Sequence, residues 1–87
     1  MTNDTMQDFG LYVIITDPVL PYRTIADVCV RRGVRMLQLR EKHLSDREQL
    51  AAAHEILEVT RGTDTLFVFN DRTDLALLSG ADGLHLG

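Results

Sequence analysis

The sequence of 87 residues has one cysteine, two prolines, no tryptophan and fewer basic than acidic side chains. The single thiol, Cys29, excludes an internal disulfide and a multi-cysteine zinc site. No apolar run approaches the roughly 18–20 residues of a membrane helix. The first ten residues carry two acids and no base, unlike the positive region of a signal peptide. These absences predict a cytoplasmic protein that does not enter the membrane.

The charge balance is acidic, with thirteen acidic and nine basic residues and a formal net charge of −4. Nucleic-acid and anionic-lipid surfaces are bound by basic footprints, so neither partner is expected. Seven of the nine bases fall between Arg23 and Arg47, and Lys42 is the only lysine. A local anion site is therefore compatible with an acidic chain.

Strand-like and helix-like segments alternate along the chain, which has room for one small domain. Apolar runs predict strands at 11–16, 34–40, 65–70 and 83–86. Apolar residues at helical spacing predict helices at 22–32, from 45 to about 61, and in the segment before the Gly80 stop. Ser45 and Glu48 have the spacing of a capping box at the start of the second helix. The apolar stripes include Leu50, Ala53, Leu57, Leu75 and Leu78.

The order β-α-β-α-β-α-β, with strands apolar on both faces, is typical of a parallel sheet with crossover helices. Strand centres recur every 24 residues or so, close to the repeat of a (β/α)₈ barrel, which needs about 200 residues or more. The pattern predicts an α/β fold comprising the first three βα units and the fourth strand of such a barrel. Residues 1–87 would then be a single incomplete domain. A small open α/β sheet fits the same periodicity.

The second strand carries the first chemical signal. Alternation places its leucines toward the helices and puts Gln38 and Arg40 on the other face, with Lys42 next in the same parity. The carboxyl end of a strand is where α/β proteins build their sites. A guanidinium fork and an ammonium suit a multiply charged anion such as diphosphate. The alternative is a solvated strand end in which Arg40 pairs with an acid such as Glu41.

The third strand ends in Asn70 and Asp71. A carboxylate at this position suits Mg²⁺, which takes one or two carboxylates together with substrate phosphates and water. Spacing alone favours a different role, since Asn-Asp after a strand is common in helix caps and turns. Strict alternation also separates the two side chains, so both reach one site only if the strand bends there.

Three further residues have simpler interpretations. His85 lies between two leucines on the fourth strand and is expected to pack inside as a hydrogen-bonded histidine. Cys29 falls on the apolar stripe of the first helix and is expected in the core. His43 follows the second strand and is expected to be exposed.

Three blocks of sequence in this order resemble the N-terminal part of thiamine phosphate synthase (thiamine-phosphate pyrophosphorylase): LYVIITDP, LQLREKHLSDRE and FNDRTDLALLSGADGLHLG. The resemblance implies a (β/α)₈ barrel. It also implies a transferase that condenses a hydroxymethylpyrimidine diphosphate with a thiazole phosphate and releases diphosphate, with Mg²⁺ as cofactor. The small-molecule substrates are the implied partners.

The resemblance also implies roles for individual residues. Gln38, Arg40, Lys42 and Asn70 would contact the pyrimidine diphosphate, and Asp71 would be a Mg²⁺ ligand. No residue is assigned as an acid or base, because fixed cations that stabilise a leaving diphosphate need none. Glu41, within the same block, is expected to contribute only backbone geometry.

The resemblance stops at Gly87, before the family's second acidic metal ligand and its thiazole phosphate loops. We therefore expect the 87 residues alone to be inactive and to self-associate through open sheet edges. Two alternatives stay open. One is a thiazole tautomerase-like isomerase on the same barrel, and the other is a non-catalytic fragment that binds diphosphate.

Overall fold

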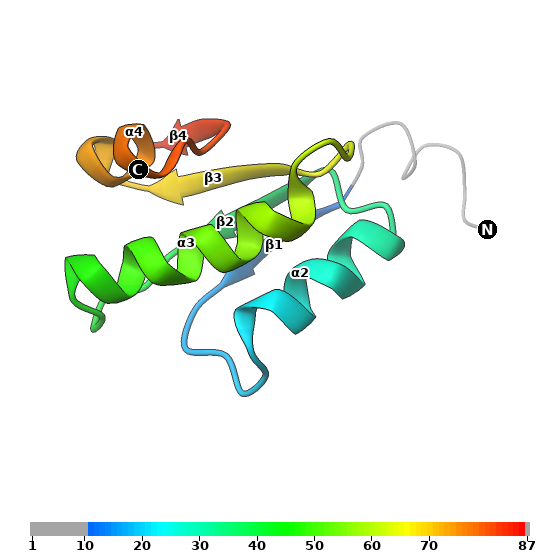
Figure 1. Cartoon of the computed structure of the whole chain (residues 1–87), viewed down its shortest axis with the longest axis horizontal. Helices are drawn as coiled ribbons and strands as arrows, with labels where there is room; N and C mark the ends of the chain where they lie inside the picture. The colour runs from blue at the N-terminus through cyan, green and yellow to red at the C-terminus, as the bar shows by residue number, and fades with distance from the viewer. Residues whose placement is uncertain (1–10, 87) are drawn as a thin grey trace.

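A computed structural model describes residues 11–86, which form four strands and three helices in strict alternation (Figure 1). The elements are β1 (Tyr12–Ile15), α2 (Tyr22–Arg31), β2 (Met36–Leu39), α3 (Asp46–Thr60), β3 (Leu66–Asn70), α4 (Thr73–Ser79) and β4 (Gly83–His85). Every strand and helix expected from the sequence is present, and most are a residue or two shorter than expected.

The four strands form one parallel sheet in the order β1-β2-β3-β4. Helices α2 and α3 pack against each other, and α4 packs on α3 and on β3. Figure 1 shows α2 and α3 side by side over one face of the sheet. Within residues 11–86 the sheet stays open, with a single neighbour for β1 and for β4. The expected parallel α/β sheet is confirmed, whereas closure into a barrel is not seen in this part of the chain.

The core lies between the sheet and the helices. Four strand side chains that point toward the helices are at most 1% exposed: Leu37, Leu39, Phe67 and Phe69. The two phenylalanine rings meet edge to face at a centroid distance of 5.4 Å, a favourable aromatic geometry. Cys29 is buried here, as expected for a core thiol.

The capping box of α3 is confirmed. Ser45 Oγ accepts from Glu48 N at 3.1 Å, and Glu48 Oε1 accepts from Ser45 N at 2.9 Å. The backbone N–H of Ser45, and after it the Ser45 side chain, stabilise the Glu48 carboxylate and lower the pKa of Glu48. The box fixes the point at which the loop after β2 ends and α3 begins.

Helix α4 differs from the expected stripe. Leu75 is buried as expected, but Leu78 is 71% exposed, and Ala76 and Ser79 are buried instead. The helix has only seven residues, so a narrow strip of it faces β3 and α3. Its stop at Gly80 is confirmed, because that residue adopts φ 78°, which glycine reaches without steric cost.

The other face of the sheet is uncovered by residues 11–86. Tyr12 is 69% exposed, Ile14 is 56% exposed and Leu66 is 48% exposed. Strand pairing aligns Tyr12 with Met36 and Met36 with Leu66, so these side chains lie on one face. We call this the open face.

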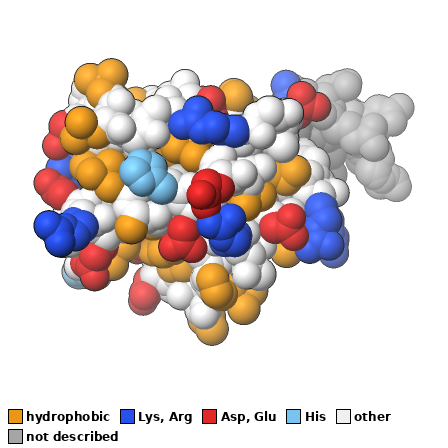
Figure 2. Space-filling view, in the orientation of Figure 1, with side chains coloured by type: hydrophobic (Ala, Val, Ile, Leu, Met, Phe, Trp, Pro, Cys, Tyr) orange, Lys and Arg blue, Asp and Glu red, His pale blue; other side chains and the backbone are white. Residues whose placement is uncertain are grey.

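On the helical side of the molecule, charged side chains of one sign do not gather into a single patch. Figure 2 shows acidic and basic side chains interspersed over the side that α2 and α3 present in this view. Among residues 11–86, no helix is long and apolar enough to span a membrane.

Candidate functional site

The carboxyl ends of β2, β3 and β4 meet at one edge of the sheet, because the strands are parallel. A pocket of about 280 Å³ opens at this edge. We call it the strand-end pocket, and it is lined by Ile14, Gln38, Arg40, Asn70, Asp71 and His85. Four of the five residues expected at the site are therefore together.

Lys42, the fifth expected residue, lies in an adjoining pocket of about 470 Å³. We call it the loop pocket, and it is lined by Arg40, Glu41, Lys42, Leu44, Gln49, Asn70, Asp71 and Arg72. The two pockets share three residues, Arg40, Asn70 and Asp71. All five expected residues thus surround one continuous hollow region, with Lys42 and Gln38 at different ends of it.

The amide side chains in the strand-end pocket are fixed by each other. Asn70 Nδ2 donates to Gln38 Oε1 at 3.0 Å and lies 3.3 Å from His85 Nδ1. Gln38 is only 8% exposed, so this hydrogen bond forms in a sheltered position. Since Gln38 accepts through its oxygen, its Nε2 group remains a donor that an anion in the pocket can use.

Asp71 marks a bend immediately after β3. Its φ is +61°, a left-handed conformation that is uncommon for a residue with a side chain and is concentrated at functional sites. The backbone N–H of Asp71 donates to the carbonyl of His85 at 2.8 Å, which holds the bend against β4. The bend brings Asn70 and Asp71 to the same pocket. Strict strand alternation would have placed their side chains on opposite faces, so this bend is what the shared site requires.

Asn70 and Asp71 do not occupy the cap position of α4, although Asp71 does form a turn there. The N-cap of α4 is Arg72, and its side chain makes no capping hydrogen bond. Instead Arg72 bonds Asp46 and Asp74, each at 2.9 Å, and these two carboxylates raise the pKa of Arg72. Arg72 lines the loop pocket, but its charge is already matched.

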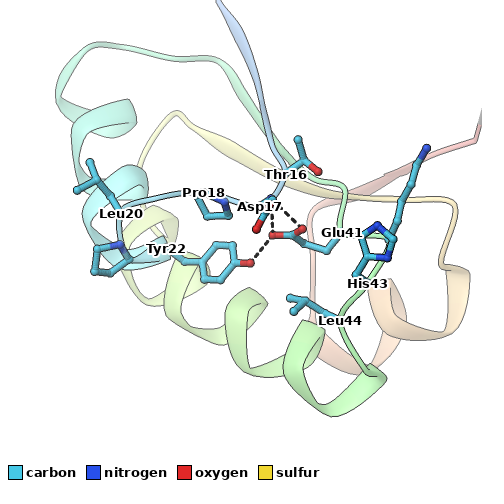
Figure 3. A pocket seen from close by; sticks show the side chains of 10 residues that line it. Thr16, Asp17, Pro18, Leu20, Tyr22, Glu41, His43 and Leu44 are labelled. Atoms are coloured by element: carbon cyan, nitrogen blue, oxygen red, sulfur yellow. Dashed lines mark hydrogen bonds between the residues drawn. The ribbon is translucent and has the colours of Figure 1, made fainter.

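Arg40 and Lys42 have the opposite electrostatic situation. Among residues 11–86, neither side chain takes part in an ion pair. The alternative in which Arg40 pairs with Glu41 is also wrong, because the Glu41 carboxylate bonds the backbone N–H of Asp17 and the hydroxyl of Tyr22 (Figure 3). Both cations are exposed, and both are left to attract an anion from solution.

A complete protein-only metal site is absent from the described part of the chain, where no three His, Cys, Asp or Glu side chains cluster suitably. Asp71 is the carboxylate that the two pockets share. One carboxylate beside the cations Arg40 and Lys42 is compatible with Mg²⁺, which completes its shell with phosphate oxygens and water.

Two residues gain a different role from the one expected. His85 is exposed and faces the strand-end pocket, because residues 11–86 leave that face of β4 uncovered. Its pairing with Asn70 in the β3–β4 register could be found only once the register was known. Glu41 contributes its side chain rather than backbone geometry alone. His43 is exposed, as expected, and lines a third pocket beside Glu41.

The fold and the pockets define a class: a parallel α/β protein with two cations, two amides and a carboxylate at the carboxyl edge of its sheet. The sequence model of the family "Thiamine monophosphate synthase" matches residues 11–87. The chain therefore belongs to the thiamine monophosphate synthase family, which confirms the resemblance.

Individual relatives agree with this assignment. The chain is 46% identical over 74 residues to thiamine-phosphate synthase of Chlorobium phaeovibrioides, a match covering 85% of this chain and 35% of that protein. It is 40% identical over 82 residues to thiamine-phosphate synthase of Methanoculleus marisnigri, covering 91% of this chain and 39% of that protein.

A solved structure gives the same result. Thiamine phosphate pyrophosphorylase from Pyrococcus furiosus superposes with a TM-score of 0.76 at 32% identity, covering 93% of this chain and 40% of that one. The chain thus spans 35–40% of the length of these three proteins.

Proposed function

We propose that this chain supplies the diphosphate-binding part of a thiamine phosphate synthase. The substrates would be a hydroxymethylpyrimidine diphosphate and a thiazole phosphate, joined with release of diphosphate. The observation that carries the proposal is the convergence of Gln38, Arg40, Asn70 and Asp71 in one pocket at the carboxyl edge of the sheet. Family membership supports it independently.

The proposed chemistry depends on charge. When the diphosphate leaves the pyrimidine, negative charge builds on its oxygens, and fixed cations stabilise that charge without a nucleophilic side chain. Of the three cations that line the two pockets, Arg72 is paired with carboxylates, whereas Arg40 and Lys42 have no ion-pair partner within residues 11–86, so their charge is available for this task. Gln38 and Asn70, fixed by their mutual hydrogen bond, would orient the group.

We assign Asp71 as a ligand of Mg²⁺. The fit rests on its place between the two pockets and on the hard oxygen ligand that it offers. Bound Mg²⁺ would neutralise part of the charge of the diphosphate. The bend at Asp71 holds the carboxylate at the carboxyl edge, beside Asn70.

We further propose that residues 1–87 are a single incomplete domain of a (β/α)₈ barrel. Strand order, open face and the 40% coverage of the Pyrococcus furiosus structure support this arrangement. On this proposal the 87 residues alone do not form thiamine phosphate, since they correspond to only 35–40% of the length of the matched proteins. A cytoplasmic location stays a prediction.

A thiazole tautomerase-like isomerase has less support. Tautomerisation moves a proton and needs no diphosphate clamp, whereas this site gathers two exposed cations and two linked amides. A non-catalytic fragment that binds diphosphate is the alternative that experiment must separate from a synthase.

The test uses a chimera in which this chain replaces the matching N-terminal part of the Chlorobium phaeovibrioides synthase, and it measures formation of thiamine phosphate. We expect Arg40→Ala and Lys42→Ala each to lower kcat/KM by about 100-fold, the scale of lost transition-state charge stabilisation. Arg47→Ala is the matched control. Arg47 is also an exposed cation and lies nearby, in the first turn of α3, but it lines neither pocket. Turnover by the two variants equal to that of the Arg47→Ala control would refute the assignment.

A further inference from the structure

Glu41 ties together two loops that leave neighbouring strands. Its Oε1 and Oε2 accept from the backbone N–H of Asp17 at 2.9 and 3.0 Å, and Oε2 also accepts from the hydroxyl of Tyr22. Figure 3 shows the carboxylate between these two partners, at the side of a pocket of about 390 Å³. Asp17 lies in the loop between β1 and α2, 24 positions before Glu41 in the chain. Tyr22 is the first residue of α2, 19 positions before Glu41.

The hydrogen bonds of Glu41 act on the segment that carries Lys42. The segment is held before Lys42 by the backbone of Arg40, whose N–H donates to Ile15 O at 3.0 Å. It is held after Lys42 by Gln49, whose Nε2 donates to Leu44 O at 3.2 Å. Glu41 is the third anchor and is adjacent to Lys42 in sequence, so it restricts the backbone from which the lysine extends.

A carboxylate fits this geometry better than an amide does. Asp17 has φ +47°, a left-handed conformation with a steric cost, and the surrounding contacts must compensate for it. Both Glu41 oxygens face N–H or O–H donors. A glutamine would turn an amide N–H₂ toward one of these donors, and at least one hydrogen bond would be lost.

The hydroxyl of Tyr22 responds to the same arrangement. Burial raises its pKa, and the hydrogen bond to Glu41 and the charge of Glu41 raise it further. The phenol therefore stays protonated and remains a donor to Glu41 well above neutral pH. The hydrogen bond between the two loops therefore does not depend on pH near neutrality.

We propose that Glu41 is a positioning residue that holds the loop after β2 against the loop after β1, so that Lys42 is directed toward a bound diphosphate. The role rests on the proposed function, because the diphosphate is the ligand that Lys42 would meet. Its carboxylate is engaged by donors on the β1 side, so it leaves the neighbouring cations unpaired.

The test is a double-mutant cycle on the 87-residue chain, with the affinity for inorganic diphosphate in the presence of Mg²⁺ measured by NMR titration. We expect Lys42→Ala to weaken binding about tenfold and Glu41→Gln about fivefold, the scale of one charge-assisted contact. If Glu41 acts through Lys42, the double variant binds no more weakly than Lys42→Ala alone. Glu58→Gln is the matched control, because Glu58 is an exposed glutamate paired with Arg23 outside the three pockets.

The outcomes separate this inference from the proposed function. Losses that multiply in the double variant would show that Glu41 acts independently of Lys42, and would overturn the positioning role alone. A wild-type chain that does not bind diphosphate would overturn the proposed function and the positioning role with it. Should Glu41→Gln fail to fold, Tyr22→Phe removes one of the three hydrogen bonds and takes its place in the cycle. We then expect about a twofold loss that disappears in the Lys42→Ala background.

Discussion

The open face of the sheet predicts self-association of the 87-residue chain, and Ile14→Lys should weaken it. Ile14 lies on β1, an edge strand within residues 11–86, and it is 56% exposed on the face away from the helices. Exposed strand edges and apolar faces promote pairing with another chain. A lysine on an edge strand opposes such pairing while leaving the helix-covered core unchanged.

The magnitude follows from the exposed fraction. Complete burial of an isoleucine side chain contributes about 1.5–3 kcal/mol, so burying the 56% that is exposed contributes roughly half of that. In a symmetric dimer each copy loses this contribution, which gives about 2–3 kcal/mol in total. The dissociation constant should therefore rise at least 30-fold. The desolvation of the new charge adds to this change.

Sedimentation velocity over a range of concentrations measures the effect. Leu77→Lys is the matched control, because Leu77 is 78% exposed but lies on α4, away from the open face. We expect Ile14→Lys to shift the chain toward monomer and Leu77→Lys to leave the distribution unchanged. A wild-type chain that stays monomeric at high concentration would refute the reasoning, and so would an equal effect of the two variants.

Three further predictions concern local structure. Ser45→Ala should lower the free energy of unfolding by about 1 kcal/mol in a urea titration, because Glu48 N–H loses the Ser45 hydroxyl as its acceptor. The pKa of Glu48 should move only part of the way back toward its ordinary value, because alanine keeps the backbone N–H that donates to the Glu48 carboxylate; an unchanged midpoint would contradict the role of the cap. Gly80→Ala should cost about 1 kcal/mol or more in the same assay, because φ is +78° and the added Cβ would lie 3.0 Å from a side-chain nitrogen of Arg61; wild-type stability would count against the left-handed stop. The pKa of Tyr22 is raised in the folded state, so the stabilisation from the protonated phenol is complete below about pH 10 and is lost as pH rises further. In Glu41→Gln the phenol should ionise at lower pH, which NMR shifts of the Tyr22 ring measure. An unchanged titration would contradict the hydrogen bond between Tyr22 and Glu41.

Much of the fold could be predicted from the sequence because strand periodicity, helix caps and glycine stops are local signals. The Ser45 box and the Gly80 stop were both predicted and are both present. Leu78 was predicted on the buried stripe and is exposed instead. Which side of a seven-residue helix is covered depends on its neighbours, and the sequence of the helix does not specify them.

The sequence predicted some residues of the candidate site and missed the side-chain role of another. Alternation along β2 and the resemblance both indicated Gln38, Arg40 and Lys42, and the structure places them around the joined pockets. The contacts of Glu41 with Asp17 and Tyr22 span 24 and 19 positions, and no local pattern encodes a hydrogen bond between loops that meet only in the folded chain. The resemblance covered the block that contains Glu41 but gave no reason to expect a side-chain role.

The carboxylate of Asp71 allows the most direct test of the account. Thiamine phosphate formation, measured with and without Mg²⁺, should be compared for the 87-residue chain, for the chimera with the Chlorobium phaeovibrioides synthase, and for that chimera carrying Asp71→Ala. We predict Mg²⁺-dependent product from the unaltered chimera alone, because only that protein combines the strand-end pocket, the metal ligand and the remainder of the synthase. Robust turnover by the 87-residue chain would contradict its assignment as an incomplete domain. Full activity of the Asp71→Ala chimera would contradict the central claim that this strand end holds the metal and the diphosphate.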